Sequence, residues 1–582
     1  MHHHGHDHAH DHAHPHVHDQ AHDHAHDGQA PEGAHALDLT IPDAELPPSA
    51  LGRRNFLRAA GVLGAGVAAA GLVDLNGAPT AYAEASDEAE AARGPKRAKR
   101  WLAGDHHIHT QFSPDGMYRV IDHVKHASAY GLDWMVITDH GSVQHAKIGV
   151  EKVNPLIKSA RSRYPGMLVF QGLEWNIPAA EHGTVFVHPG ASEVAVLREF
   201  ENAYDGVVKG ATASAPANEK LALAGLQFLA SAVSDRRVRD AIMFANHPAR
   251  KGIDSPHEIR GWRDAAKGIA MGMEGAPGHQ AAGLPTPTGP GSGRGYYDNS
   301  RGKDSFAAYP EESYRTFGGF DWMTSTVGGL WDSLLAEGKA WWITANSDSH
   351  SVYLDTAVRG PGSDFAANGL YNDPVNGTTP LATNGDYWPG YYSRTHVGAA
   401  KATYADVMQG LREGRVWVDH GGLVDTLEVN VGADGSGAGL GGSVLVRRGT
   451  RARLQIVITL AAEPNWAGFV PKLRRIDAIV GEVTGPAKDP DTFTAPGTKV
   501  AHTWDISRNG PGDTVTLTLP LPAVTDRGLY VRLRGSDGKR LTTGLRGAQV
   551  DPAGPVMDVM GAANPWEDLW FYTNPIWVLP RR

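Results

Sequence analysis

The sequence predicts an α/β fold with a parallel sheet or barrel, followed by an antiparallel β-sandwich. After about residue 100, short apolar runs alternate with helical patterns, as they do in βαβ units. Five of these apolar runs are followed by His, Asp or Glu. From about Val424 the pattern changes to strict alternation of apolar and polar residues, broken by Gly, Pro and Asp, which is typical of an antiparallel sandwich.

The first 83 residues are predicted to lie outside this fold. Residues 2–26 hold 13 histidines interleaved with Asp and Ala, a tract too polar to build a core, which favours metal collection over a compositional accident. Arg53 and Arg54 precede an Ala/Gly-rich apolar run and the small-x-small sequence Ala81-Tyr82-Ala83. This order resembles a twin-arginine export signal, and the apolar run is too short for a stable membrane span. We therefore expect export by the twin-arginine machinery, cleavage near Ala83 and a secreted or cell-envelope location.

The composition excludes two classes of protein. The 582 residues include no cysteine, which rules out a disulfide-stapled scaffold and a thiolate zinc site. The formal net charge is −10, which argues against a protein that coats nucleic acid, because that function needs clustered Lys and Arg. The expected organisation is a leader and signal peptide at 1–83, a charged linker at 84–100, a barrel at 101–423 and a sandwich-like domain at 424–582.

The predicted strands of the barrel present polar side chains just past their carboxyl ends. In a barrel or an open α/β sheet these ends converge on one face, where ligand sites are built. Imidazoles and carboxylates that converge without Lys or Arg among them need cations, and nitrogen and oxygen donors without sulfur suit zinc, manganese or iron. The apolar runs 101–104, 134–137, 168–170, 242–244 and 341–343 lead in turn to His107 and His109, to His140, to Glu174, to His247, and to Asp348 and His350.

Six short motifs follow one another between about residues 101 and 421. They are His107-x-His109-Thr110, Ser113-Pro114-Asp115-Gly116, Thr138-Asp139-His140-Gly141, Gly172-Leu173-Glu174, Asn246-His247-Pro248 and Asp348-x-His350. In content and order they resemble the PHP (polymerase and histidinol phosphatase) metallohydrolases. The helix at 404–415 is similar to the segment that closes exported, carbaryl-hydrolase-like PHP proteins. The resemblance implies a distorted (β/α)7 barrel that binds two or three divalent metal ions.

The resemblance also implies which residues bind these ions. His182 is preferred to His188 on this ground, although His188 stands at the carboxyl end of the run 184–187, where strand ends place ligands. Asp139 is expected to orient a ligand rather than to bind metal. One metal would be held by His107, His109, Glu174 and Asp348; a second by Glu174, His182 and His247; and a third, whose occupancy stays open, by Asp115, His140 and His350.

This chemistry predicts hydrolysis of a small-molecule ester. Divalent ions a few Å apart lower the pKa of a bridging water and clamp the oxygens of the substrate, and a phosphoester is the expected substrate because its oxygens are anionic. Arg250 and Lys251 are candidates to bind the phosphate, with a solvated basic loop as an equal alternative. Asp348 and His350 are the candidates for proton transfer.

Four other functions stay open. The barrel could hydrolyse a carbamate or an aryl ester, the chain could be a secreted metal-binding protein without turnover, or the sandwich could be an adhesion module that carries the barrel as a passenger. A polymerase-associated or histidinol-phosphate role is disfavoured by the export signal.

The remaining polar and loop features are assigned no catalytic role. Glu274 follows the apolar run 269–273 and is expected at most to line the barrel. His123 and His126 have an i, i+3 spacing that can chelate, but they are interpreted as a polar helix face. The histidines without partner spacing are interpreted as ordinary residues; they are His145, His257, His279, His396, His420 and His502. The Gly/Pro/Ser-rich stretch 275–320 and the insertion 360–390, with Tyr371, Tyr387 and Trp388, are expected to form substrate-selectivity walls, with mobile surface loops as the rival interpretation.

Overall fold

Seven strands form the barrel that the alternating pattern predicts. They pair in chain order, and a parallel bridge between Ile108 and Ser349 joins the ends of the first and last of them. The pairs are parallel except those that β4 makes with β3 and β5, so the barrel is a distorted (β/α)7 barrel, as expected. The strands are β1 (Arg100–Asp105), β2 (Trp134–Ile137), β3 (Leu168–Asn176), β4 (His182–Val187), β5 (Ala241–Ala245), β6 (Ala270–Ala276) and β7 (Trp342–Ala345).

The computed structural model describes residues 100–297, 300–544 and 546–581, which belong to one compact unit, residues 70–582. The predicted leader, signal peptide and cleavage site, and the linker up to residue 99, lie outside the described residues. Within the described ranges, none of the helices combines the length and the apolar composition that crossing a bilayer requires.

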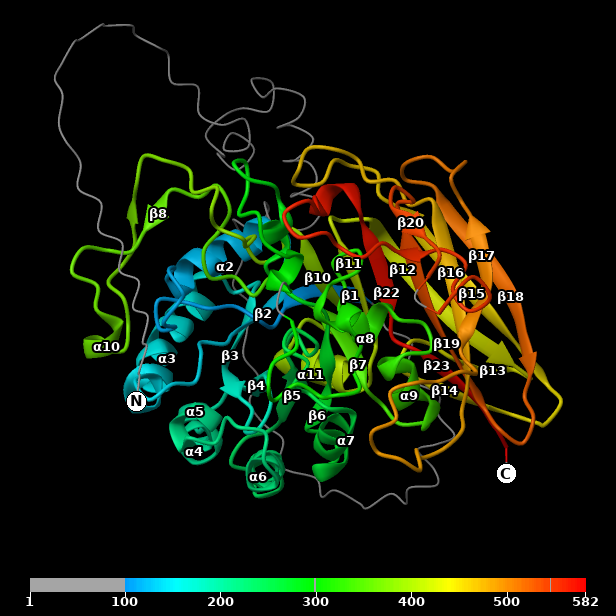
Figure 1. Cartoon of the computed structure of the whole chain (residues 1–582), viewed down its shortest axis with the longest axis horizontal. Helices are drawn as coiled ribbons and strands as arrows, with labels where there is room; N and C mark the ends of the chain where they lie inside the picture. The colour runs from blue at the N-terminus through cyan, green and yellow to red at the C-terminus, as the bar shows by residue number, and fades with distance from the viewer. Residues whose placement is uncertain (1–99, 298–299, 545, 582) are drawn as a thin grey trace, which may run out of the picture. The chain divides into compact units, whose positions relative to one another are not determined.

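Helices cover the barrel strands on the outside (Figure 1). Helix α3 buries Val150, Val153 and Ile157 at the three- to four-residue spacing of one helical face. Ser255 begins α7 as a capping box with Glu258, in which each side chain accepts a bond from the other residue's backbone N–H. The helices are α2 (Val120–Ala129), α3 (His145–Arg163), α4 (Glu193–Tyr204), α5 (Gly206–Lys209), α6 (Pro216–Ser234), α7 (Pro256–Ala265), α8 (Trp322–Ser325) and α9 (Leu330–Ala336).

Two antiparallel strands extend the barrel sheet toward the C-terminal part of the chain. Strand β10 (Ser393–Ala399) pairs with β1, α11 (Tyr404–Arg412) follows it, and β11 (Val416–His420) pairs back with β10. Strand β22 (Trp570–Thr573), near the end of the chain, pairs with β11. The barrel sheet is therefore hydrogen-bonded to the C-terminal strands.

The C-terminal strands form the predicted sandwich, which is antiparallel except that β14 pairs with β23 in parallel. One sheet has the order β13-β12-β15-β18, and the other belongs to the large sheet and contains β14, β16, β17, β19, β22 and β23. Their facing residues, such as Leu427, Ile456 and Val531, share one core. The strands are β12 (Val424–Ala433), β13 (Ser436–Ala438), β14 (Ser443–Val446), β15 (Arg451–Leu460), β16 (Arg475–Glu482), β17 (Lys499–Asp505), β18 (Thr514–Ala523), β19 (Leu529–Ser536) and β23 (Ile576–Pro580).

The two long insertions contain only short elements. The stretch 275–320 contains 3-10 turns at Gln280–Gly283, Arg294–Tyr296 and Glu311–Tyr314. The insertion 360–390 contains helix α10 (Phe365–Asn368) and strand β9 (Val375–Asn376), which pairs with β8 (Ala357–Val358). The pair β20 (Leu541–Thr542) and β21 (Gly554–Pro555) and the turn Pro565–Glu567 complete the described elements.

Candidate metal centre

Glu174 lies at the centre of the nine residues implied as metal ligands. It is fully buried in β3. Each of its oxygens approaches ring nitrogens of several histidines at a distance compatible with a shared cation. Oε1 lies 3.0 Å from Nε2 of His107, 3.2 Å from Nδ1 of His182 and 3.3 Å from Nε2 of His247, and Oε2 lies 2.8 Å from Nδ1 of His140 and 3.4 Å from Nε2 of His109.

Asp348 is a second carboxylate close to His107 and His109, the two rings that also approach Glu174. Its Oδ1 is 3.0 Å from Nε2 of His107 and 3.2 Å from Nε2 of His109. Together with Glu174, these side chains form the first of the three implied groups. Asp348 follows β7, and both histidines follow β1, so the arrangement comes from strand ends that meet at one face.

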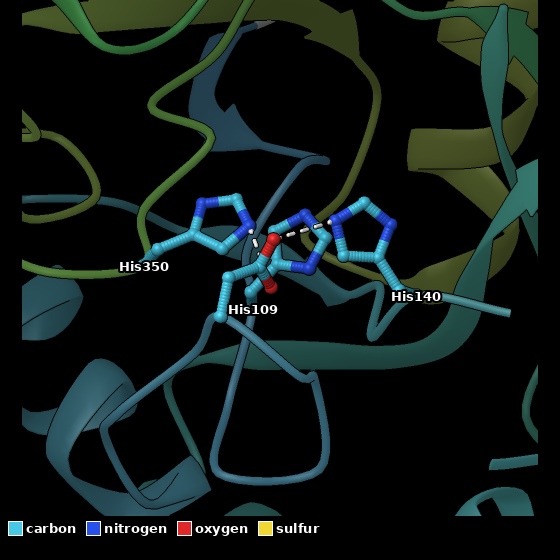
Figure 2. A group of neighbouring side chains, drawn as sticks. His109, His140 and His350 are labelled. Atoms are coloured by element: carbon cyan, nitrogen blue, oxygen red, sulfur yellow. Dashed lines mark ion pairs between the residues drawn. The ribbon is translucent and has the colours of Figure 1, made fainter. Parts of the chain in front are cut away.

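The third implied group surrounds the carboxylate of Asp115. Its Oδ2 is 3.2 Å from Nε2 of His140, and its Oδ1 is 3.3 Å from Nε2 of His350. The rings of His109, His140 and His350 converge (Figure 2), and those of His109 and His350 stack at 3.8 Å. Ligand atoms of these four residues all lie within 4.8 Å of one another. Three of the four, Asp115, His140 and His350, are the residues implied for the third metal, and His109 is one of those implied for the first.

The direction of β4 explains why His182, and not His188, reaches this cluster. Strand β4 runs antiparallel to both neighbours, so its first residue, His182, lies at the face where the parallel strands end. His188 follows its last residue at the opposite face, where Nδ1 is 2.9 Å from the carbonyl oxygen of Pro189. The strand-end argument, which places His188 at the site, fails here because it assumes a parallel strand.

This assignment predicts different effects of two single substitutions. We expect His182→Ala to lose roughly one bound metal equivalent, because three protein ligands are the usual minimum for a stable site. We expect His188→Ala to keep the wild-type metal content. Elemental analysis of the two full-length variants tests this, and equal metal loss in both would contradict it.

The donor atoms fit metal ions because their usual hydrogen-bond partners are missing. Among the described residues, Nε2 of His109, Nε2 of His350, Nδ1 of His182 and Oδ1 of Asp348 are buried and form no hydrogen bond. Leaving such groups unpaired costs free energy, which a cation offsets. The donors are nitrogen and oxygen, which suits zinc, manganese or iron.

The second nitrogen of several rings is held by a neighbour, which fixes the ring orientation. Nδ1 of His107 is 2.8 Å from Oε1 of Glu274, and Nδ1 of His350 is 2.9 Å from the carbonyl oxygen of Asp348. Nδ1 of His109 is 2.9 Å from Oγ of Ser113, which in turn donates to Asp139. Each contact leaves Nε2 directed at the cluster, a pattern common for metal-binding histidines. Asp139 acts through Ser113, as its expected orienting role requires.

The electrostatics of the cluster favour added positive charge. Burial alone would raise the pKa of Glu174, but the imidazoles of His107, His182 and His140 hold it well below its usual value. Burial lowers the pKa of His107, yet the carboxylates of Asp348, Glu174 and Glu274 raise it well above its usual value. A buried position that draws positive charge in this way is one that a divalent cation can fill.

The cluster opens into a cavity of about 610 Å³. Arg250 is largely buried and lines this cavity beside His247, whereas Lys251 is half-exposed and is not part of the lining. Both cations share one carboxylate, since Nη2 of Arg250 is 3.2 Å and Nζ of Lys251 is 2.9 Å from Oε1 of Glu181. Of the two cations, Arg250 is thus the one at the cavity.

Two residues of the cavity were not predicted from the sequence as site residues. His279, interpreted as an ordinary residue, has Nε2 2.8 Å from Oδ2 of Asp348. Asp386 hydrogen-bonds to Nδ1 of His279. Burial would lower the pKa of His279, but Asp348 and Asp386 raise it to about 10. His279 follows the end of β6, so the strand-end argument that found the other ligands could have found it.

Both insertions contribute to the cavity, but the three residues expected from the second one do not. The stretch 275–320 supplies His279 and Tyr296 to the lining. The insertion 360–390 supplies Asp386, whereas its three expected wall residues lie elsewhere. Tyr371 donates a hydrogen bond to the carbonyl oxygen of Pro114, Tyr387 packs on Trp566, and Trp388 stacks on His126 at 3.8 Å.

Comparison with known proteins gives a family match at this part of the chain. Residues 105–235, which contain six of the nine cluster residues, match the PHP domain model. This part of the chain is therefore similar to a PHP domain. No curated protein sequence matches the chain significantly.

Two solved structures are similar to the chain. A two-domain protein of Bacteroides vulgatus that contains a predicted PHP-like metal-dependent phosphoesterase aligns with 79% of this chain and 96% of its own, at 14% identity and a TM-score of 0.31. The lesion-specific endonuclease of Pyrococcus furiosus aligns with 60% of each chain, at 10% identity and a TM-score of 0.25.

Proposed function

We propose that this PHP-domain protein is an exported metal-dependent phosphoesterase. The observation that carries the proposal is the buried cluster around Glu174. Four of its donor atoms form no hydrogen bond among the described residues, and the cluster opens into a cavity that Arg250 also lines. A metal-dependent hydrolase needs these two features together, a set of unpartnered ligands and room for a substrate beside them.

Each part of the cluster has a role in this function. His107, His109, Glu174 and Asp348 would hold one divalent ion, Glu174, His182 and His247 a second, and Asp115, His140 and His350 a third. Bound there, such ions lower the pKa of a water between them and neutralise charge that develops on the ester oxygens.

The protein's own side chains would orient the ester and manage the proton. Arg250 lines the cavity, and its Nε forms no hydrogen bond among the described residues. We assign to its guanidinium the binding of a phosphate oxygen. Asp348 and His350 line the same cavity and are the groups we assign to proton transfer. His350 donates from Nδ1 to a backbone carbonyl, so Nε2 is its only nitrogen that can move a proton, and it can do so only while the third metal, which would bind the same atom, is absent.

The role of Arg250 predicts a charge-dependent loss of activity. We expect Arg250→Met to lower kcat/KM for a phosphodiester about 10²-fold, because a hydrogen bond to a charged group contributes about 1.5–3 kcal/mol. Hydrolysis of an uncharged aryl ester should change much less. Lys251→Met is the matched control, since it removes the same charge from a residue outside the cavity lining. Equal effects of both substitutions on the phosphodiester would contradict this role.

A panel of substrates on the metal-loaded protein tests the proposed function itself. A phosphodiester, a phosphomonoester and an aryl carbamate with the same leaving group are compared, each with and without chelator. Chelator-sensitive turnover of a phosphoester supports the proposal. Preferred turnover of the carbamate would assign the alternative substrate class to the same barrel, and bound metal without any turnover would favour a metal-binding protein.

A further inference from the structure

His279 connects the metal-ligand candidate Asp348 to the backbone that follows it. Its Nε2 is 2.8 Å from Oδ2 of Asp348, and its Nδ1 hydrogen-bonds to Oδ1 of Asp386. The other oxygen of Asp386 accepts hydrogen bonds from the backbone N–H groups of His350, at 2.6 Å, and Ser351, at 2.7 Å. All of these groups except Ser351 are buried. The imidazole of His279 therefore holds the start of the segment 348–351, and the carboxylate of Asp386 holds its end.

This segment needs such support because its backbone is strained. Asp348 has φ +46°, in the left-handed region that residues with a Cβ rarely adopt. The backbone N–H of His279 donates to the carbonyl oxygen of Ser347 at 3.2 Å. A Cβ on the preceding residue, Gly278, would lie 2.2 Å from both Cβ of Asp348 and the carbonyl oxygen of Ser347, so only glycine permits this approach. The loop that carries His279 is thus packed directly against the strained turn.

The contacts favour a hydrogen-bonding role for His279 over a further metal site. Ligand atoms of His279, Asp348 and His350 lie within 4.8 Å of one another. However, Nδ1 of His350 is 2.9 Å from the carbonyl oxygen of Asp348 and donates to it, so this nitrogen has no lone pair to offer. The other nitrogen of His350, Nε2, is 3.3 Å from Oδ1 of Asp115 and belongs to the group implied for the third metal. Only two ligands remain for a separate site, fewer than stable sites use.

We propose that His279 is a positioning residue that holds Oδ2 of Asp348, so that Oδ1 alone faces His107 and His109. Asp386 fixes the imidazole and, through the N–H groups of His350 and Ser351, the turn that carries both Asp348 and His350. The proposal rests on the proposed function to the extent that the cluster binds metal ions. His279 and Asp386, which are not among the nine implied ligands, thus set the metal affinity and the geometry of the centre.

Metal affinity and ligand-field spectra test the proposal without recourse to activity. Co²⁺ is titrated into the full-length wild type, His279→Ala, His279→Gln and Asp386→Asn, in competition with a chromophoric chelator. All four proteins carry the same His-rich leader, so differences between them report the cluster. We expect His279→Ala to weaken the tightest Co²⁺ site about 10–100-fold, the range typical of residues that orient ligands, and to change the visible spectrum. His279→Gln, whose amide N–H can still donate to Asp348, should recover most of the affinity, and Asp386→Asn should lie between them.

His396→Ala is the matched control. His396 is also buried and hydrogen-bonded to a carboxylate, with Nε2 2.8 Å from Oδ1 of Asp419, but it touches none of the nine candidate ligands in the described contacts. Wild-type affinity and spectrum in His279→Ala, or a loss no larger than in His396→Ala, would overturn the proposal. If His279→Ala does not fold, Asp386→Asn carries the same prediction. If the wild type has no Co²⁺ site tighter than those of its leader, the metal centre itself would be overturned, and this proposal with it.

Discussion

Glu174→Gln is expected to remove stoichiometric metal binding and to lower chelator-sensitive hydrolysis about 10³-fold or more. Both oxygens of Glu174 face histidines of different groups, so one substitution affects at least two of the implied sites. Glutamine keeps the shape but lacks the charge and offers only one acceptor oxygen. Loss of the metal contribution, several kcal/mol, corresponds to this change in rate. The metal content and kcat/KM of the full-length variant measure the two effects.

The control for Glu174→Gln is Glu201→Gln. Glu201 in α4 is equally buried and lies 2.8 Å from Nδ1 of His145, so it loses the same charge from the same kind of pair outside the cluster. Circular dichroism of both variants establishes that the barrel has folded. Wild-type metal content in Glu174→Gln, or equal losses in both variants, would show that Glu174 is not the centre of a metal site.

Arg532→Met is expected to destabilise the protein by about 3–5 kcal/mol, because it leaves a buried carboxylate without its cation. Arg532 in β19 makes two hydrogen bonds to Asp332 in α9, Nε to Oδ1 at 2.8 Å and Nη2 to Oδ2 at 2.7 Å. Both side chains are fully buried, and the guanidinium lies over the ring of Trp331. The pair joins a barrel helix to a sandwich strand, so its loss should weaken the packing between them.

Urea-induced unfolding, followed by tryptophan fluorescence, measures this effect as a lower midpoint. Arg527→Met is the matched control, because the pair of Arg527 with Glu482, 3.2 Å apart, is exposed on both sides and should contribute no more than about 1 kcal/mol. Adding Asp332→Asn to Arg532→Met removes the uncompensated charge and should recover part of the stability. A midpoint unchanged from wild type in Arg532→Met would show that the pair does not hold the two parts together.

The barrel could be predicted from the sequence because its signals are local. Each apolar run is short, each is followed by its polar ligand within a few residues, and the strand ends of a barrel share one face. The sandwich strands are predictable for the same reason, from their period of two. Neither signal reports the pairing of β22 with β11, which lie about 150 residues apart, because strand pairing over such a distance leaves no local pattern.

The direction of β4 and the roles of His279 and Asp386 could not be predicted from the local sequence pattern. An apolar run has the same composition whichever way its strand points, so the run 184–187 could not show that His182 lies at the site. The resemblance to the PHP family placed it correctly in space. Asp386 comes from near the end of a long insertion with short elements, and nothing in its spacing links it to His279.

Anomalous X-ray scattering from crystals of the full-length protein grown with Mn²⁺ or Zn²⁺ tests the central claim most directly, because it locates each ion and separates the cluster from the His-rich leader. The account predicts at least two peaks within about 2.0–2.3 Å of the donor atoms, with Glu174 contacting both of the strongest. A map with no peak among Glu174, His107, His109 and Asp348, in crystals that hold the metal elsewhere, would contradict it.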